Sequence, residues 1–509
     1  PEKNRMEGFE QLLYGFRIAL EPMKIWYAFI GVTFGTSIGV LPGIGPVTGI
    51  AILLPLTFGK DPTGALIMLA GIYYGAMYGG STTSILCNIP GESASVMTAV
   101  EGYQLARQGR GGAALGMSAF GSFIAGTIGL ALLGVLAPTI AGIALKFGPP
   151  EYFSLLMCAY TMVAALSTNN VIKGLISVAV GMFITTIGMD AMSGEPRFTL
   201  GIMGLVDGID FVIVAIGLFA IAEMLTNLEY LQTPIAQLKK FRIRELFPTV
   251  ADWRESIWPI LRATGLGFLI GCLPGGGATI TSFLTYGMEK SISKHPEKFG
   301  TGVMGAVAAV ESSNNAASSG AFVPLLTLGI PSGGAAAMLL GGFMLLGIAP
   351  GPTLFTLHPE VVWGLIASMY IGNVMLLILN LPLIGLFMQI LRLPYPVMTL
   401  FVVILSVLGV YSLTNDIFKL WILLFFGIVG YVMRKLDFPL PPLLLGVVLG
   451  DMTESNFRQA LSLSEGSWMI FVQRPISLTL LLLLGTVLAV QIFMISRYGA
   501  KRTYESDDA

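Results

Sequence analysis

Charged side chains are scarce in this chain of 509 residues. Asp, Glu, Lys and Arg together make up 11% of the sequence, the net charge is -1, and no long basic tract is present. Soluble domains carry about 25% charged residues, so the composition excludes an ordinary soluble protein. A near-neutral charge without a basic tract also excludes nucleic acid as a partner.

Side chains that perform chemistry are scarce as well. The two histidines, His295 and His358, lie beside prolines in polar stretches, and the three cysteines lie in apolar or motif sequence. No Ser–His or Cys–His pair and no zinc-binding cluster fits this distribution. The Gly275-Gly276-Gly277 run lacks the Lys-Ser/Thr that completes a phosphate-binding loop. The sequence therefore predicts a protein that is not an enzyme and holds no cofactor, with Na⁺ as a possible coupling ion.

Long apolar runs fill most of the sequence. Hydrophobic residues make up 54% of the chain. About 20 apolar residues in a helix cross a bilayer, and the runs lack the alternation of barrel strands. The sequence predicts an all-α polytopic membrane protein with roughly 11–13 spans. The candidate spans lie at roughly 25–41, 63–80, 113–143, 152–167, 171–189, 208–228, 257–272, 301–320, 335–348, 361–390, 396–411, 416–433 and 475–496.

Polar segments divide the chain into five predicted parts. An N-terminal polar segment precedes a first membrane half, and a basic cytoplasmic linker separates this half from a second one, which a cytoplasmic tail follows. These parts are residues 1–24, 25–228, 229–256, 257–496 and 497–509, respectively.

Two helix-breaking elements each occur twice. Leu41-Pro42-Gly43 returns as Leu273-Pro274-Gly275, and the Ile-Pro step at Pro90 returns at Pro331. Gly/Pro interruptions at matching places in two halves of a membrane protein are typical of a substrate site built from broken helices. The sequence predicts re-entrant hairpins or half-helices at the breaks, where protein or a water-filled cavity covers the backbone. The predicted broken segments are 43–58, 82–97, 278–288, 322–333 and 439–452.

Loop charges predict that the two repeats have inverted topology. The turn near Lys60 has a single Lys, whereas its counterpart in the second half, residues 289–300, has three. The other pair differs in the opposite sense: the loop 101–112 has Arg107 and Arg110, whereas its counterpart 349–360 has no Lys or Arg. Positive charge stays cytoplasmic, so equivalent loops lie on opposite faces. The N-terminal segment and the linker are both basic, although inverted repeats begin on opposite sides. An extra membrane crossing, or a surface helix outside the repeat, reconciles these two basic segments with inverted repeats.

The breaks are the predicted substrate site. Half-helix N-termini bind carboxylates through open backbone N–H groups, and Ser, Thr and Asn add neutral donors. The alternative is that these small residues allow close helix packing. The candidate substrate-binding residues are Gly43, Gly45, Ser81, Thr82, Thr83, Asn88, Pro90, Gly91, Gly275, Gly276, Asn314, Asn315, Pro331, Ser332 and Gly333.

Oxygen-rich side chains near the breaks are candidates for cation coupling. Exposed carbonyls at broken helices suit Na⁺. Glu92 and Glu311 carry charge at membrane depth, which usually faces a cavity; the alternative is that Glu92 closes a hairpin at the interface and Glu311 caps a helix. The candidate cation-coupling residues are Ser81, Thr83, Asn314, Ser318, Glu92 and Glu311. Another polar group, Asp190, Glu195, Arg197, Asp207 and Asp210, is predicted to be a solvated turn.

At these residues the chain resembles the large transmembrane subunit of bacterial tripartite tricarboxylate transporters. The resemblance covers nearly the whole chain, and the long block is highly specific. The matching blocks are Leu41-Pro42-Gly43-Ile44-Gly45-Pro46, Tyr73-Tyr74-Gly75-Ala76-Met77-Tyr78-Gly79-Gly80-Ser81-Thr82-Thr83-Ser84-Ile85-Leu86, Asn88-Ile89-Pro90-Gly91-Glu92, and Asn314-Asn315-Ala316-Ala317 through Leu326-Thr327-Leu328-Gly329-Ile330-Pro331.

The resemblance implies a multi-pass secondary transporter of the bacterial inner membrane. Such a subunit takes up an organic tri- or dicarboxylate by symport driven by a Na⁺ or H⁺ gradient. Its implied partners are a small membrane subunit, a periplasmic substrate-binding protein that delivers the carboxylate, and the lipid bilayer. The alternative is a passive channel, or a docking scaffold without coupled transport of its own.

Overall fold

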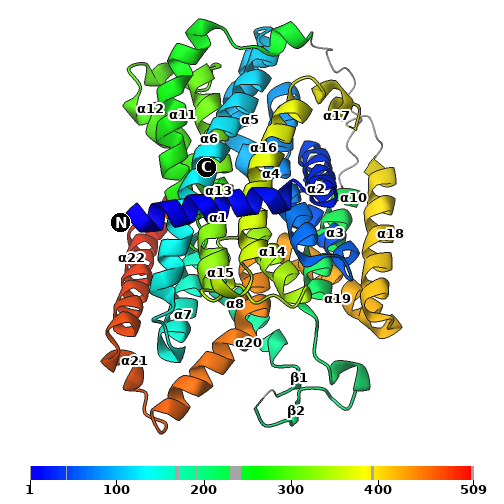
Figure 1. Ribbon diagram of the computed structural model, residues 1–509, viewed down its shortest axis with the longest axis vertical. Coiled ribbons are helices and arrows are strands. Elements are labelled where there is room, and N and C mark those ends of the chain that lie inside the picture. The colour runs from blue at the N-terminus through cyan, green and yellow to red at the C-terminus, as the bar shows by residue number, and fades with distance from the viewer. Residues whose placement is uncertain are drawn as a thin grey trace. The chain divides into compact units, whose positions relative to one another are not determined.

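The computed structural model describes residues 2–41, 43–166, 171–190, 192–229, 242–390 and 395–505. Residues 230–241, part of the predicted basic linker 229–256, lie outside the described residues. Helices account for nearly all regular structure in the described ranges, and the strands β1 (Gly188–Met189) and β2 (Pro196–Arg197) form one short antiparallel hairpin (Figure 1). The expected all-α membrane fold is confirmed.

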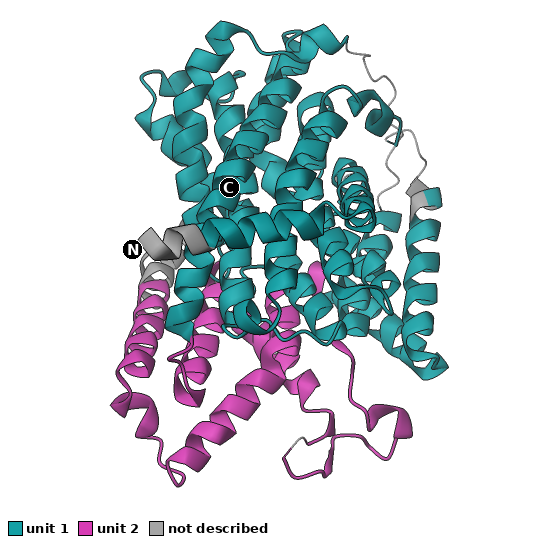
Figure 2. Cartoon of the chain, viewed as in Figure 1, with its two compact units in different colours: residues 1–144, 212–432 teal, residues 145–211, 433–509 magenta. Residues whose placement is uncertain are grey.

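The helices group into two compact units (Figure 2). Unit 1 comprises residues 1–144 and 212–432, and unit 2 comprises residues 145–211 and 433–509. Both copies of the sequence repeat fall in unit 1. The candidate site therefore lies in unit 1.

The two repeats fold into the same succession of elements. In each, a helix ends at Leu-Pro-Gly, a short helix and a long helix follow, and the long helix ends just before Ile-Pro. The first repeat comprises α2 (Pro22–Val40), α3 (Pro46–Leu53), α4 (Pro62–Cys87), α5 (Val96–Arg107) and α6 (Gly111–Ala144). The second comprises α11 (Val250–Gly271), α12 (Ala278–Ile292), α13 (Met304–Leu328), α14 (Gly334–Leu345) and α16 (Pro359–Asn380). The inverted orientation stays a prediction.

Matching backbone conformations end the helices of the two repeats. Gly43 and Gly275 have φ of 82° and 80°, in the left-handed region that favours glycine. The long helices α4 and α13 end on Asn88 and Gly329, with φ of 58° and 69°. Asn88 thus occupies the left-handed helix-ending position that the second repeat fills with glycine.

Glycine stripes pack the first helix of each repeat onto its long helix. A Cβ on Gly31 or Gly39 of α2 would clash with backbone carbonyls of α4, and a Cβ on Gly267 or Gly271 of α11 would clash with carbonyls of α13. Small residues let membrane helices approach closely in this way. The stripes hold the helices that carry the Ser/Thr/Asn runs.

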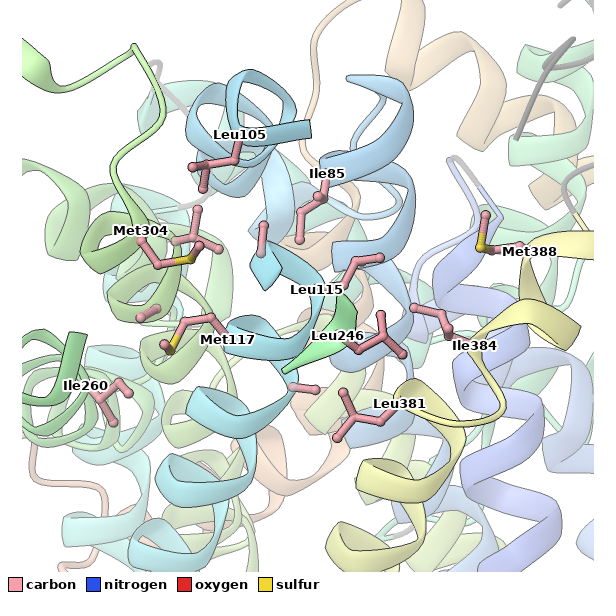
Figure 3. Packing of buried hydrophobic residues seen from close by; sticks show 14 residues of the cluster. Ile85, Leu105, Leu115, Met117, Leu246, Ile260, Met304, Leu381, Ile384 and Met388 are labelled. Atoms are coloured by element: carbon pink, nitrogen blue, oxygen red, sulfur yellow. The ribbon is translucent and has the colours of Figure 1, made fainter. Parts of the chain in front are cut away.

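Apolar side chains from both repeats share one core (Figure 3). Ile85 of α4, Leu105 of α5 and Met117 of α6 belong to the same buried cluster as Ile260 of α11 and Met304 of α13. This cluster fixes the repeats against each other near the end of α4. The elements of unit 1 outside the repeats are α1 (Glu2–Ala19), α9 (Phe211–Ala215), α10 (Ala222–Glu229), α15 (Leu354–Leu357), α17 (Ile384–Ile390), α18 (Tyr395–Thr414) and α19 (Ile417–Lys435).

Several predicted spans and breaks differ from the structure. The segment 439–452, predicted as broken, belongs to the continuous 24-residue helix α20 (Leu440–Leu463). The predicted span 335–348 is the 12-residue α14, about 18 Å long and therefore a half-helix. Within the described ranges, five helices are long and apolar enough to cross a membrane: Pro22–Val40, Gly111–Ala144, Phe211–Glu229, Pro359–Asn380 and Ile417–Lys435.

Unit 2 contains α7 (Pro149–Leu166), α8 (Val171–Thr185), the β hairpin, α20, α21 (Ile470–Gln473) and α22 (Pro475–Glu505). Asp190 at the hairpin is buried and pairs with Arg197 and Arg458. Backbone N–H groups and Arg458 hold the pKa of Asp190 well below its usual range. The predicted solvated turn is therefore wrong for Asp190, because the two arginines compensate the cost of burying its charge.

The charge asymmetry of the loops predicts the membrane side of each turn. We expect cysteines introduced at Arg107 and Lys294 to be protected from an impermeant thiol reagent in intact cells, and a cysteine at Thr356 to be labelled. All three side chains are exposed in the structure, so burial does not determine the result. Labelling of position 294 from outside, or protection of position 356, would defeat the inverted-repeat assignment.

Candidate functional site

Three half-helices of unit 1 begin at a glycine without a side-chain cap. α3, α12 and α14 have Gly45, Gly277 and Gly333 as their N-caps, and in none of them does a backbone N–H donate to a capping side chain. A Cβ on Gly45 or Gly277 would meet no atom within 4 Å, and one on Gly333 would meet only the Gly277 Cα at 4.0 Å. The first N–H groups of a helix carry its positive end, so these termini can receive an anion.

Segments from three breaks meet in what we call the tip region, residues 91–93, 277–279 and 332–333. The Ser93 and Thr279 hydroxyls are 2.8 Å apart, which joins the first repeat to the start of α12. The Gly275 N–H donates to the Ser332 carbonyl at 2.8 Å, which joins the two breaks of the second repeat. Pro331 precedes Ser332, so the second Ile-Pro step lies at this junction.

Other predicted glycines serve packing in this structure. A Cβ on Gly91 would clash with the Gly39 carbonyl, and one on Gly276 would clash with the Ile270 carbonyl. Neither has positive φ. Gly43 lies outside the tip region, since its Cβ would be 3.1 Å from Glu223 Oε1 on α10.

The predicted broken segment 82–97 contains the break between α4 and α5, at residues 88–95, but residues 82–87 continue α4, so the Ser/Thr runs do not form the helix breaks. Ser81, Thr82 and Thr83 lie within α4, and Ser318 lies within α13. Two of these hydroxyls are satisfied inside their own helix: Thr83 donates to the Gly80 carbonyl at 3.3 Å and Ser318 to the Asn315 carbonyl at 2.8 Å. Such back-bonding lets a polar run continue a helix.

Glu311 of α13 lies at the centre of a buried polar cluster. Its side chain is fully buried, and its carboxylate accepts hydrogen bonds from Ser81 Oγ at 2.5 Å, from Thr98 Oγ1 and from Asn314 Nδ2 at 3.5 Å. Ser81 and Thr98 come from α4 and α5. The carboxylate therefore joins the second repeat to two helices of the first.

Asn315 joins α13 to α6. Its amide nitrogen contacts Ser122 Oγ at 2.8 Å, the Glu311 carbonyl at 3.1 Å and Asn314 Oδ1 at 2.7 Å. The predicted substrate ligand Asn315 is thus bonded within the protein in this structure.

A small pocket, with room for about one water molecule, lies beside this cluster. Ser81 and Thr82, both predicted from the sequence, are among its lining residues. Tyr78 also lines it and is held by a hydrogen bond to Asn373 Oδ1 at 2.6 Å. Ser81 therefore lines the pocket and also bonds Glu311 through its hydroxyl. The remaining lining residues are Leu115, Ser118, Ala119, Asn380 and Ile384.

Glu92 is a second buried carboxylate near α4. Its side chain packs against Gly80, where a Cβ would be 2.8 Å from Glu92 Cγ, and its Oε1 atom has no hydrogen-bond partner within the described residues. Gly80 precedes Ser81, so the two carboxylates flank the same turn of α4. Asn88, by contrast, is exposed and ends that helix.

Thr98, Ser122, Tyr78 and Asn373 were missed by sequence reasoning. Each is a polar side chain within a helix, and such residues in membrane segments usually contact a partner. That signal marks them as buried contacts but does not say which helix they meet.

The contacts of Asn315 predict that its loss affects stability first. Asn315→Ala removes an amide that bonds three protein groups, so we expect a cost of about 1–3 kcal/mol from the unsatisfied acceptors and a lower unfolding temperature in detergent. Asn314→Ala removes only one of these three acceptors, together with a 3.5 Å contact to Glu311, and should unfold closer to wild type. An Asn315→Ala protein of wild-type stability that has lost uptake would show instead that Asn315 is a direct ligand.

Comparison with known proteins gives a family match across most of the chain. The family model described as Tripartite tricarboxylate transporter TctA family matches residues 25–445. An uncharacterized 52.8 kDa protein in the TAR-I ttuC' 3' region of Agrobacterium vitis is 46% identical over 476 residues, which cover 94% of each chain. An uncharacterized protein in the TAR-II ttuC' 3' region of the same organism is 46% identical over 215 residues, 42% of this chain and 89% of that protein. No solved structure matches.

Proposed function

Because the chain belongs to the tripartite tricarboxylate transporter TctA family, we propose that it carries an organic tri- or dicarboxylate into the bacterial cell across the inner membrane. Uptake is by alternating access and is coupled to a cation gradient. The family match and the apolar helices together identify the chain as a multi-pass membrane subunit of a transporter.

The observation that carries this proposal is the set of uncapped half-helix N-termini in unit 1. α12 and α14 start at glycines that leave space in front of their first N–H groups, and these starts belong to the tip region. Open N–H groups and the positive end of a helix bind a carboxylate without a fixed positive charge that would trap it. The substrate carboxylates are therefore proposed to bind at Gly277 and Gly333.

The contacts between the repeats support the proposed movement. Glu311 links α13 to α4 and α5, and Ser93 links the first tip to α12. A carrier alternates between two arrangements of its repeats, one open to each side of the membrane. Contacts between the repeats differ in the two arrangements. The proposed partners, implied by the family, are a small membrane subunit and a periplasmic binding protein that delivers the carboxylate.

The experiment is reconstitution of this chain with its two partner subunits in liposomes. Citrate, dicarboxylates and aromatic acids are offered with imposed Na⁺ or H⁺ gradients. We expect saturable uptake of one acid class that requires the binding protein. The rival function, a passive channel or docking scaffold, predicts non-saturable entry or none, and uptake by liposomes without this chain would likewise contradict the proposal.

A further inference from the structure

We propose that Glu311 is the site of the coupling ion, that this ion is a proton, and that Ser81 connects the site to the pocket beside α4. The inference rests on the proposed function and deepens it by naming the ion and the residue that carries it. Three features of the structure lead to it.

The first feature is a buried negative charge without a positive partner. Glu311 is fully buried, and within the described ranges no Lys, Arg or His forms an ion pair with it. The titratable groups within electrostatic reach are Tyr78 of α4 and Glu92 before α5, and neither is a cation. The serines, threonine and asparagines that contact Glu311 or its backbone do not titrate. A carboxylate in this setting is stabilised by binding a cation during the cycle.

The second feature is the kind of atom that surrounds the carboxylate. The hydroxyls of Ser81, Thr98 and Ser118 bond the carboxylate, and Asn314 presents its amide nitrogen, because Asn314 Oδ1 accepts from Asn315. Sodium takes oxygen ligands, so a sodium ion here would require the donating hydroxyls to turn their oxygens toward it and the amide nitrogen to move away. Protonation of Glu311 needs no new ligand, because a hydroxyl that donates to the carboxylate can rotate and accept from the carboxylic acid.

The third feature is a route by which a proton can reach Glu311. The same bonds also join the two repeats, so protonation of Glu311 affects the contact between them. Ser81 lines the pocket and bonds Glu311 through its hydroxyl, so a proton can pass from water in the pocket through Ser81 to a Glu311 oxygen and return the same way. The bonds to Ser81 and Thr98 are also contacts between the repeats. Protonation changes which group donates in those bonds, and this links the charge of Glu311 to the contact that alternating access must change.

Glu311→Gln in the full reconstituted complex is the test. Glutamine keeps the size and hydrogen bonding of the side chain but neither binds nor releases a proton. We expect the variant to lose accumulation driven by a pH gradient to a much greater extent than exchange of internal for external carboxylate without a gradient, which should remain measurable. Glu311→Asp, which still titrates, should restore part of the accumulation. In wild-type liposomes, carboxylate entry should bring protons in.

Each alternative outcome has a separate meaning. Wild-type accumulation that follows Na⁺ and ignores the pH gradient would overturn the proton assignment and leave the proposed function intact. Undiminished accumulation by Glu311→Gln, or equal loss of accumulation and exchange in a variant of wild-type thermal stability, would overturn the role of Glu311. If Glu311→Gln does not fold, absence of proton entry with wild-type protein would overturn the inference. No uptake or exchange of any carboxylate by the wild-type complex would instead contradict the proposed function.

Discussion

Gly333→Val is expected to abolish uptake while the protein folds and assembles normally. Gly333 has φ of -178°, which any residue adopts, and its Cβ would meet only the Gly277 Cα at 4.0 Å. The valine side chain would occupy the space in front of α14, where the proposed carboxylate contacts open N–H groups. Each hydrogen bond to a charged ligand contributes about 1.5–3 kcal/mol, so losing two reduces affinity by roughly two decades or more.

Gly265→Val is the matched control for this experiment. Gly265 lies on α11, and a Cβ there would meet no atom within 4 Å. The control should retain uptake and membrane amounts close to wild type. Gly91→Val would not test the site, because its Cβ would clash with the Gly39 carbonyl and the protein would fail to pack. Near-normal uptake by Gly333→Val at low substrate would remove the α14 terminus from the site.

Glu101→Ala is expected to cause a large loss of stability. Glu101 of α5 is fully buried and accepts hydrogen bonds from the backbone N–H groups of Gly300, Gly302 and Val303 at 2.5, 2.8 and 2.9 Å, and from the Tyr286 hydroxyl at 2.8 Å. Alanine leaves all four donors without this acceptor. Hydrogen bonds to charged groups contribute about 1.5–3 kcal/mol each, and partial hydration reduces their sum, so we expect a loss of about 3–5 kcal/mol.

Glu101→Gln serves as the conservative comparison, because one amide oxygen keeps part of the acceptor capacity. Unfolding temperature of the detergent-solubilised protein should fall in the order wild type, glutamine, alanine. Equal temperatures for wild type and the alanine variant would show that water or another residue satisfies the four donors, and that the contact between α5 and the turn before α13 contributes little.

The breaks were predictable because proline and glycine act on their own backbone. Leu-Pro-Gly marked the turns at Gly43 and Gly275, which share the same left-handed conformation, and Ile-Pro marked the ends of α4 and α13. These effects depend on neighbours in sequence alone. The pairing of the repeats as equivalent elements could therefore be predicted without coordinates.

The contacts of the polar residues were not predictable in the same way. Ser81 meets Glu311, and Asn315 meets Ser122, across large separations in sequence. A serine on an apolar helix has the same local sequence whether it bonds its own backbone, as Thr83 does, or another helix. For this reason the sequence predicted the polar residues themselves but extended the predicted break 82–97 over residues 82–87, which are the end of α4.

The steady-state accumulation ratio of the carboxylate in reconstituted liposomes tests the central claim most directly. The complete complex is given an inward cation gradient, and internal and external carboxylate are measured after uptake has stopped rising. A coupled carrier raises the internal concentration above the external one, and the ratio collapses when an ionophore dissipates the gradient. A ratio that never exceeds the value set by the membrane potential alone, and that ignores the ionophore, would contradict coupled transport and identify the chain as a passive pathway.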